Sequence, residues 1–266
     1  MTEMVFEKRS FGKMLKSMLK ADFKRMFTMP LVYIMAGIGL AMPILILVMT
    51  AMTGGGTTVD PTTGAETAME AFTNVWQTLG AVSGASAGMD LTSMCNINLM
   101  YFLVAIAVCV FVAEEFKSGY AKNLFTVRAK KTDYVVSKTL VAFTAAAIMF
   151  VMYFIGAMIG GAIAGLPFDT AGFGAGGIIS CFISKIFMTA VFVSIALLLS
   201  VTAKQKLWLS VLCSIAAGML LFMMIPIAAP LDANIVNVFV CLAGGGLFAA
   251  GLGVASKIVL DKTSLA

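Results

Sequence analysis

TLVAFTAAAIMFVMYFIGAMIGGAIA, residues 139–164, contains no charged residue and decides the class of this protein. The run is longer than the roughly 20 residues that an α-helix needs to cross the hydrocarbon core of a bilayer. In lipid, a single segment satisfies all of its backbone hydrogen bonds only as a helix. We therefore expect residues 139–164 to form a transmembrane helix.

The rest of the chain repeats this pattern. Mean hydropathy is +1.01 and 12% of the residues are charged, whereas about a quarter are charged in soluble domains. We predict an all-α integral membrane protein in which residues 1–266 form one transmembrane domain with six spans. Besides 139–164, the spans are expected at about 31–53, 94–113, 178–201, 207–229 and 235–255.

Lys and Arg predict the orientation of the spans, because cytoplasmic loops carry an excess of these residues. If the N-terminus is cytoplasmic, seven of them precede span one, six lie between spans two and three, two between spans four and five, and two follow span six. The outer loops then carry none. Residues 1–30 show no cleavable signal. We expect cytoplasmic N- and C-termini and a multi-pass protein of a bacterial inner (plasma) membrane.

Residues 11–27, FGKMLKSMLKADFKRMF, place apolar side chains at three- and four-residue spacing and lysines on the other face. Within the cytoplasmic segment 1–30, this pattern predicts an amphipathic interfacial helix with its lysines toward anionic headgroups. A simple positively charged anchor is the alternative. The residues assigned to the interface are Lys13, Lys16, Lys20, Phe23 and Lys24.

The segment 114–138, EEFKSGYAKNLFTVRAKKTDYVVSK, lies between spans two and three on the predicted cytoplasmic side. Ser118 and Gly119 are expected to end the preceding helix, and a short element with exposed apolar residues follows at 120–127. Thr132 and Asp133 are expected to cap the helix of span three. A short helix of this kind has little use for the bilayer itself, so we interpret it as a docking surface. The alternative is an ordinary basic inner loop.

These two segments, together with six spans in about 260 residues, resemble the permease subunits of type-2 ATP-binding-cassette exporters, which include bacterial drug and antibiotic-peptide exporters. The resemblance implies a dimer of permeases, the second being a copy or a paralogue, with ATPase subunits that bind ATP and magnesium. It also makes 114–138 the coupling segment that contacts the ATPase. The implied contacts are Glu114, Glu115, Gly119, Tyr120, Asn123, Leu124, Phe125 and Arg128.

Several kinds of chemistry are excluded or unsupported by the sequence. The chain has no histidine, which excludes a Ser-His-Asp triad. It also has no G-x-x-x-x-G-K-[ST] motif, so this chain does not itself form a P-loop. The G-x-S-x-G match at 84–88 and the G-x-G-x-x-G match at 172–177 lack the strands that such motifs follow. Five cysteines without paired spacing indicate reduced core residues. We expect no metal, no cofactor, no nucleic-acid partner and no enzymatic activity in this chain.

Lys185 lies within span four, where a buried ammonium is costly. It is a candidate for the translocation path, and snorkelling to the outer interface is the alternative. In the outer loop, Met69, Phe72, Val75, Trp76 and Leu79 predict a helix over 66–79. The small residues of span three, Gly156/Gly160 and Gly161/Gly165, indicate close helix packing within the bundle, with a subunit interface as the alternative.

The sequence thus favours the permease of an ATP-driven exporter of an amphipathic peptide, drug or lipid. The rivals are an ion-coupled secondary transporter, an intramembrane hydrolase and a non-transporting membrane assembly protein. A secondary transporter normally has acidic residues at mid-membrane and often an internal sequence repeat. This sequence shows neither feature. An intramembrane hydrolase needs a nucleophile with a base, or paired carboxylates, and the span interiors lack both.

Overall fold

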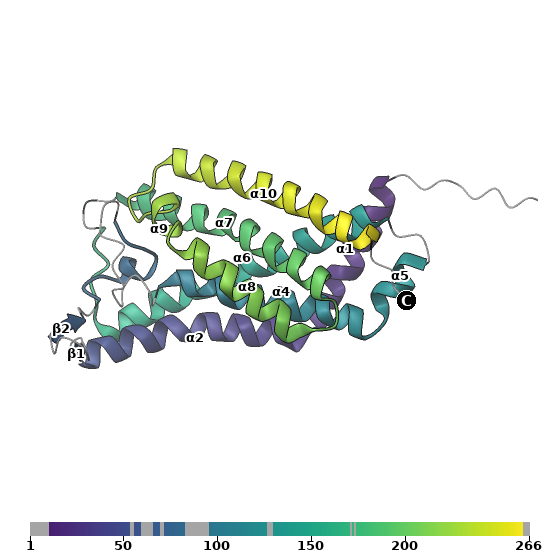
Figure 1. The fold of residues 1–266 in the computed structure, drawn as a ribbon. Coiled ribbons are helices and arrows are strands. Elements are labelled where there is room, and N and C mark those ends of the chain that lie inside the picture. Colours follow the sequence, from purple (N-terminus) through teal and green to yellow (C-terminus); the bar gives the residue numbers. More distant parts are fainter. Residues whose placement is uncertain are drawn as a thin grey trace, which may run out of the picture.

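The computed structural model describes residues 11–53, 56–59, 66–69, 72–82, 96–126, 130–170, 172 and 174–262. They form a helical bundle with one small hairpin (Figure 1). The elements are α1 (Phe11–Thr28), α2 (Pro30–Thr53), β1 (Gly56–Val59), β2 (Glu66–Met69), the 3-10 turns η1 (Val75–Thr78) and η2 (Ile97–Leu99), α4 (Met100–Lys117), α5 (Tyr120–Thr126), α6 (Lys131–Ala164), α7 (Gly174–Ala203), α8 (Leu207–Phe222), α9 (Ile225–Ala228) and α10 (Ile235–Lys262).

In the described part of the chain, five helices are long and apolar enough to cross a membrane, namely α2, α4 together with η2, α6, α7 and α10. By this measure the chain is a multi-pass membrane protein. Four of the five contain a predicted span in full, and α4 with η2 covers the span 94–113 from residue 97 onward. Two helices extend furthest beyond the predicted bounds. α6 starts at Lys131 instead of at 139, and α10 continues to Lys262 instead of ending at 255. No Gly or Pro interrupts these extensions, so the helices continue beyond the apolar stretch.

The fifth predicted span, 207–229, is not one continuous helix. Residues 207–229 form α8, which has 16 residues, a turn at Met223 and Met224, and then the four-residue α9. Pro226 lies in the first turn of α9. A proline has no backbone N–H and its ring clashes with the preceding helical turn, so α8 ends before it.

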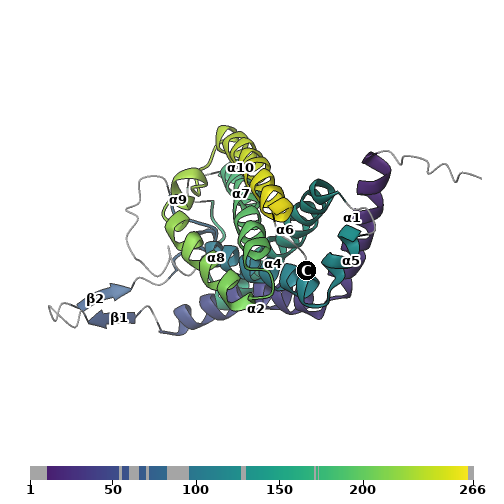
Figure 2. The ribbon, with the colours of Figure 1, turned by 45° about the vertical axis from the view of Figure 1, so that its right-hand side comes forward.

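At one end of the bundle, the predicted helix over 66–79 is wrong. Residues 66–69 form β2, which pairs antiparallel with β1, with Gly56 opposite Met69. The hairpin points away from the bundle (Figure 2). In the described residues 72–79 the 3-10 turn η1 follows, and Asn74 caps it by accepting a hydrogen bond from the Trp76 N–H. The β-branched residues around 57–59 favour a strand, so the apolar spacing in 66–79 misled the prediction.

The opposite end holds α1, α5 and the end of α10 (Figures 1 and 2). Lys131 at the start of α6 ties α6 to the end of α10, because its ammonium donates to the Leu260 carbonyl and pairs with Asp261 at 3.3 Å. The predicted cap at Thr132 and Asp133 is wrong: the residue before the helix is Lys130, which has extended backbone and makes no side-chain capping bond. We call this end, defined by α1, α5 and the end of α10, the α1 end.

The glycines of α6 act within the bundle. A Cβ on Gly160 would lie 2.8 Å from the Ile44 Cα, and one on Gly156 would collide with the Leu40 carbonyl. Both partners belong to α2, so these two glycines let α2 and α6 pack backbone to backbone. Gly161 instead faces Val75 of η1, and Gly165 ends α6 with φ of 69°.

Candidate functional site

A network of four buried or half-buried charges lies at the α1 end. The Lys138 ammonium donates to both Asp22 and Glu115, and the Arg25 guanidinium also donates to Glu115. The Ser137 hydroxyl donates to the other Asp22 oxygen at 2.6 Å. The four charges come from α1, α4 and α6, so the network joins three helices that are far apart in the sequence.

The local sequence places each charge on an inward face. In α1, Met18, Asp22 and Met26 follow one another at four-residue spacing and are all buried, which makes one stripe along the helix. Glu115 lies in the last turn of α4. Lys138 lies two turns into α6. The amphipathic α1 therefore packs on α6 through an acid on its apolar face.

The electrostatics of the network are balanced. Asp22 and Glu115 are 0% exposed and Lys138 is 1% exposed, and with Arg25 the two positive charges match the two negative ones. Burying a charge without a partner costs several kcal/mol, and a pair offsets this cost only with good hydrogen bonds. Including the bond that Ser137 donates, the network contains four hydrogen bonds. Removing one member would leave an uncompensated charge in the interior.

α5 is attached to this network through aromatic side chains. The Arg25 guanidinium lies 4.2 Å from the Tyr120 ring centroid, and Phe125 packs edge-on against Tyr134 at 5.1 Å. The Tyr134 hydroxyl donates to Glu115 at 2.8 Å. Burial, together with the nearby carboxylates of Asp22 and Glu115, raises the pKa of Tyr120. Both ends of α5 thus contact residues that also hold Glu115.

Gly119 sets the direction of α5. Its φ is 73°, in the left-handed region that glycine adopts without steric cost. This residue ends α4, and its carbonyl accepts the Asn123 N–H at 3.1 Å in the first turn of α5. The predicted helix break at Ser118 and Gly119 is confirmed.

The predicted contact residues fall into three groups. Glu114 and Asn123 are exposed, whereas Gly119, Tyr120, Leu124 and Phe125 are half-buried. Glu115 is buried in the charge network and does not reach the surface of the chain. Arg128 lies outside the described residues. On α1, Phe23 is partly buried against the core and Lys13, Lys16, Lys20 and Lys24 are exposed.

The sequence did not predict four of the site residues, Asp22, Arg25, Tyr134 and Lys138. One signal was present, because Asp22 is an acid at the centre of the apolar stripe of 11–27. Lys138 gave no such signal, since it closes a basic segment and its burial depends on α1 packing against α6.

Lys185 lies in a second polar cluster, nearer the other end of the bundle. It is fully buried, and its ammonium donates to Asn98 Oδ1 at 2.6 Å. The Tyr101 hydroxyl donates to the Lys185 carbonyl at 2.9 Å. Ser184 is also buried, and its hydroxyl has no hydrogen-bond partner in the described chain. The Lys185 side chain therefore faces the bundle interior, and the snorkelling alternative is wrong.

Comparisons with protein-family models, with curated proteins and with solved structures find no match to this chain. Among the described residues, no group of three or more His, Cys, Asp or Glu side chains is placed to hold a metal ion. Any function of the chain has to be inferred from its own geometry.

Proposed function

We propose that this chain is the permease subunit of an ATP-driven exporter in a bacterial inner membrane. It would move an amphipathic peptide, drug or lipid outward, with energy from a separate ATPase subunit on the cytoplasmic side. Two permeases, either copies or paralogues, would form the transport path. In this proposal the six apolar runs cross the membrane and the α1 end faces the cytoplasm, as the distribution of Lys and Arg favours.

The observation that carries the proposal is α5. This helix of seven residues lies outside the bundle at the α1 end, with Lys122 and Asn123 exposed and Leu124 and Phe125 half-buried. A soluble partner that covered it would bury apolar side chains and meet polar groups at the rim, which is the usual composition of a protein interface.

The contacts below α5 support a coupling role. A push on Phe125 would act on Tyr134, which is bonded to Glu115, and Glu115 is bonded to Lys138 and Arg25. Displacement of α5 would therefore act on α1, α4 and α6 together. In this proposal Glu115 is a positioning residue that holds α5, while the exposed and half-buried residues of α5 meet the ATPase.

The test is co-purification. The tagged chain would be isolated from its native membrane in mild detergent, with and without Phe125→Asp, and the preparation would be assayed for a bound ATPase subunit. We expect an ATPase with the native chain and loss of most of it with Phe125→Asp, because a carboxylate would be buried in an apolar contact. Gln205→Asp adds the same charge at an exposed position in the α7–α8 turn and is expected to retain the ATPase.

Two results would overturn the proposal. One is the absence of any ATPase under conditions that preserve other membrane complexes of the same cells. The other is retention of the ATPase by Phe125→Asp when size-exclusion chromatography shows that the variant is folded. Loss with both Asp variants would mean that negative charge at this end acts non-specifically, and the α5 assignment would be withdrawn.

A further inference from the structure

Residues 72–82, which we call the cover segment, lie at the end of the bundle that carries the hairpin, opposite to the α1 end (Figure 1). The segment contains η1 and belongs to none of the long apolar helices. Its side chains at Phe72, Val75, Thr78 and Leu79 are nevertheless at most 3% exposed. A connection normally runs over the surface of a protein, so this burial sets the cover segment apart from an ordinary outer loop.

The backbone of the cover segment lies beside the Lys185 ammonium. A Cβ on Gly80 would lie 3.5 Å from both the Cε and the Nζ of Lys185, and 3.8 Å from the Ala229 carbonyl oxygen. The carbonyl of the next residue, Ala81, accepts the Leu231 N–H at 2.8 Å. The cover segment therefore lies between the lysine of α7 and the connection that leads into α10.

The charge of Lys185 is poorly compensated in this closed arrangement. The side chain is fully buried, and its ammonium donates to the neutral amide of Asn98 at 2.6 Å. Among the described residues, no carboxylate forms an ion pair with it, and the hydroxyl of the adjacent Ser184 has no hydrogen-bond partner there. A buried charge is costly unless it is paired and hydrogen-bonded. Contact with water would therefore stabilise this cluster.

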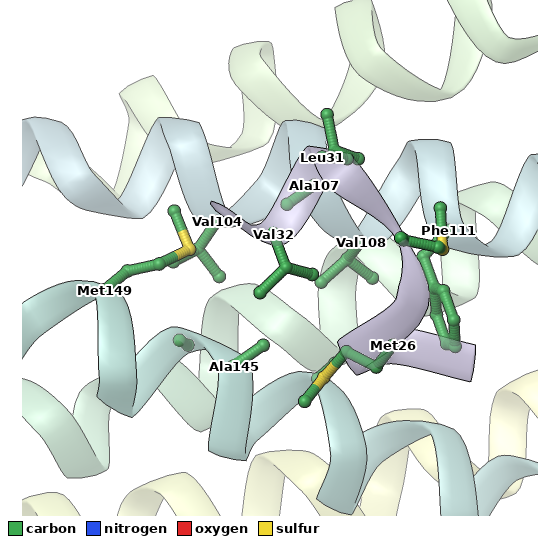
Figure 3. Close-up of a pocket in the computed structure, with 12 residues that line it drawn as sticks. Met26, Leu31, Val32, Val104, Ala107, Val108, Phe111, Ala145 and Met149 are labelled. Carbon is green, nitrogen blue, oxygen red and sulfur yellow. The ribbon is translucent and has the colours of Figure 1, made fainter. Parts of the chain in front are cut away.

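Water has no evident path to Lys185 from the α1 end. On that side, the Tyr101 ring packs 5.1 Å from the Phe150 ring and 4.3 Å from the Phe192 ring, and all three are at most 4% exposed. Next to this aromatic layer, a gap between α1, α2, α4 and α6 encloses about 30 Å³ (Figure 3). Its twelve lining residues are apolar, and a space of this size is too small for a chain of water molecules. Hydration of Lys185 thus requires the cover segment to move.

The cover segment can move without disrupting a spanning helix. In the described part of the chain, its hydrogen bonds to other segments go to carbonyls of residues 167–169, between α6 and α7, and come from the Leu231 N–H, between α9 and α10. The Asn74 amide makes one of these bonds at 2.7 Å and the Trp76 indole makes another at 3.0 Å. All of these partners are in connections at the same end of the bundle, and the contacts with the helices are apolar.

We propose that residues 72–82 form a movable cover over Lys185, and that hydration of the Lys185 ammonium favours the open state. Closing buries the apolar side chains of the cover segment, whereas opening restores water to a charge whose described side-chain partner is one neutral amide. Opening is then a local event that needs less free energy than unfolding of the bundle. This inference is independent of the exporter proposal, because it needs neither an ATPase nor α5.

Cysteine labelling measures the opening. In a variant without native cysteines, Thr78→Cys would be the single cysteine, and the purified full chain in mild detergent would be treated with a water-soluble maleimide. Thr73→Cys, exposed in the same segment, gives the uncovered rate, and Ser194→Cys, buried in α7 beyond Phe192, reports unfolding of the bundle. We expect Thr78→Cys to react more slowly than Thr73→Cys and about ten-fold or more faster than Ser194→Cys.

The role of the Lys185 charge is tested by its sign. Asn98→Leu removes the acceptor of the ammonium and should speed up the labelling of Thr78→Cys. Lys185→Met/Asn98→Leu removes the charge and its acceptor together, so neither is left buried without the other. We expect this double variant to label about ten-fold or more slowly than the chain with native Lys185 and Asn98, because the desolvation of a buried ion exceeds the roughly 1.4 kcal/mol that corresponds to a factor of ten.

The cover is ruled out if Thr78→Cys reacts no faster than Ser194→Cys, since the segment would then move only when the bundle unfolds. The role of Lys185 is ruled out if the double variant labels as fast as, or faster than, the chain with native Lys185 and Asn98. In that case the Lys185–Asn98 bond would merely hold the helices together. If size-exclusion chromatography shows that Asn98→Leu does not fold, the comparison of the double variant with the native pair decides the test alone.

Discussion

Lys138 is the residue on which the buried network depends, because its single ammonium faces two carboxylates. Lys138→Met would leave Asp22 and Glu115 close together in the interior with Arg25 as the remaining cation among the four. Removing one partner of a buried ion pair typically costs about 3–5 kcal/mol. We expect the free energy of unfolding in SDS titrations to fall by about this amount.

The double variant Asp22→Asn/Lys138→Met restores the balance of charge, since Glu115 and Arg25 remain as a pair. We expect it to recover more than half of the lost stability. Lys122→Met removes a lysine that is exposed on α5 and should change stability by less than about 0.5 kcal/mol. Equal losses for Lys122→Met and Lys138→Met would show that the network contributes nothing beyond general charge.

For single residues, the sequence indicates which side chains stand out better than it indicates which side chains they contact. Tyr120 and Phe125 could be chosen because aromatic residues in a basic loop stand out. Glu115 could be chosen too, but its burial could not, since that depends on Arg25 and Lys138 arriving from helices 90 and 23 residues away in the chain. For Lys185 the sequence left an inward orientation and snorkelling open, and both its burial and its partner Asn98 required the fold.

Among the helices, α7 and α10 pack closely where Gly245 faces Phe187. A Cβ on Gly245 would lie 2.7 Å from the Phe187 carbonyl, whereas one on the adjacent Gly246 would meet nothing within 4 Å. Gly245→Leu should therefore force the helices apart and lower the free energy of unfolding by about 2 kcal/mol or more. Gly246→Leu should leave it unchanged or raise it by less than about 1 kcal/mol, because leucine favours a helix over glycine.

The same unfolding titration tests both glycines in parallel. A loss of stability for Gly246→Leu as large as that for Gly245→Leu would contradict the α7–α10 contact. It would instead indicate that the Gly246 face of α10 is covered, for example by a second copy of the chain.

Element positions were predictable because long apolar runs have one solution in a bilayer. The ends of the elements were less predictable: α6 and α10 continue beyond the hydrophobic stretch, and Pro226 divides the fifth apolar run into α8 and α9. The hairpin of β1 and β2 was missed because apolar residues at helical spacing over 69–79 outweighed the β-branched residues that precede them. Short segments outside the bundle carry too few residues for periodicity to decide between helix and strand.

For the molecule as a whole, the decisive question is how often the chain passes along the bundle. α7 ends at Ala203 on the α1 end, and the Leu231 N–H donates to the Ala81 carbonyl at 2.8 Å near η1, at the opposite end. α8 and α9 must therefore carry the chain from one end to the other. α8 alone is about 24 Å long at the helical rise per residue, shorter than the roughly 30 Å of hydrocarbon, so α9 has to complete the pass.

This arrangement predicts which loops share a side of the membrane. In a variant without native cysteines, single cysteines would replace Lys24, Gln205, Thr73 and Asn234, and intact cells would be treated with a membrane-impermeant maleimide. We expect Thr73→Cys and Asn234→Cys to react at once and Lys24→Cys and Gln205→Cys to react only after permeabilisation, because the basic residues gather at the α1 end.

Reversal of all four would place the α1 end outside and remove α5 from the reach of any cytoplasmic ATPase. If Asn234→Cys alone joined the protected group, α8 and α9 would not cross, and the start of α10 would lie on the cytoplasmic side, although Leu231 lies beside Ala81 at the other end of the bundle. The reactivity of Asn234→Cys in intact cells therefore decides whether both termini lie on the cytoplasmic side.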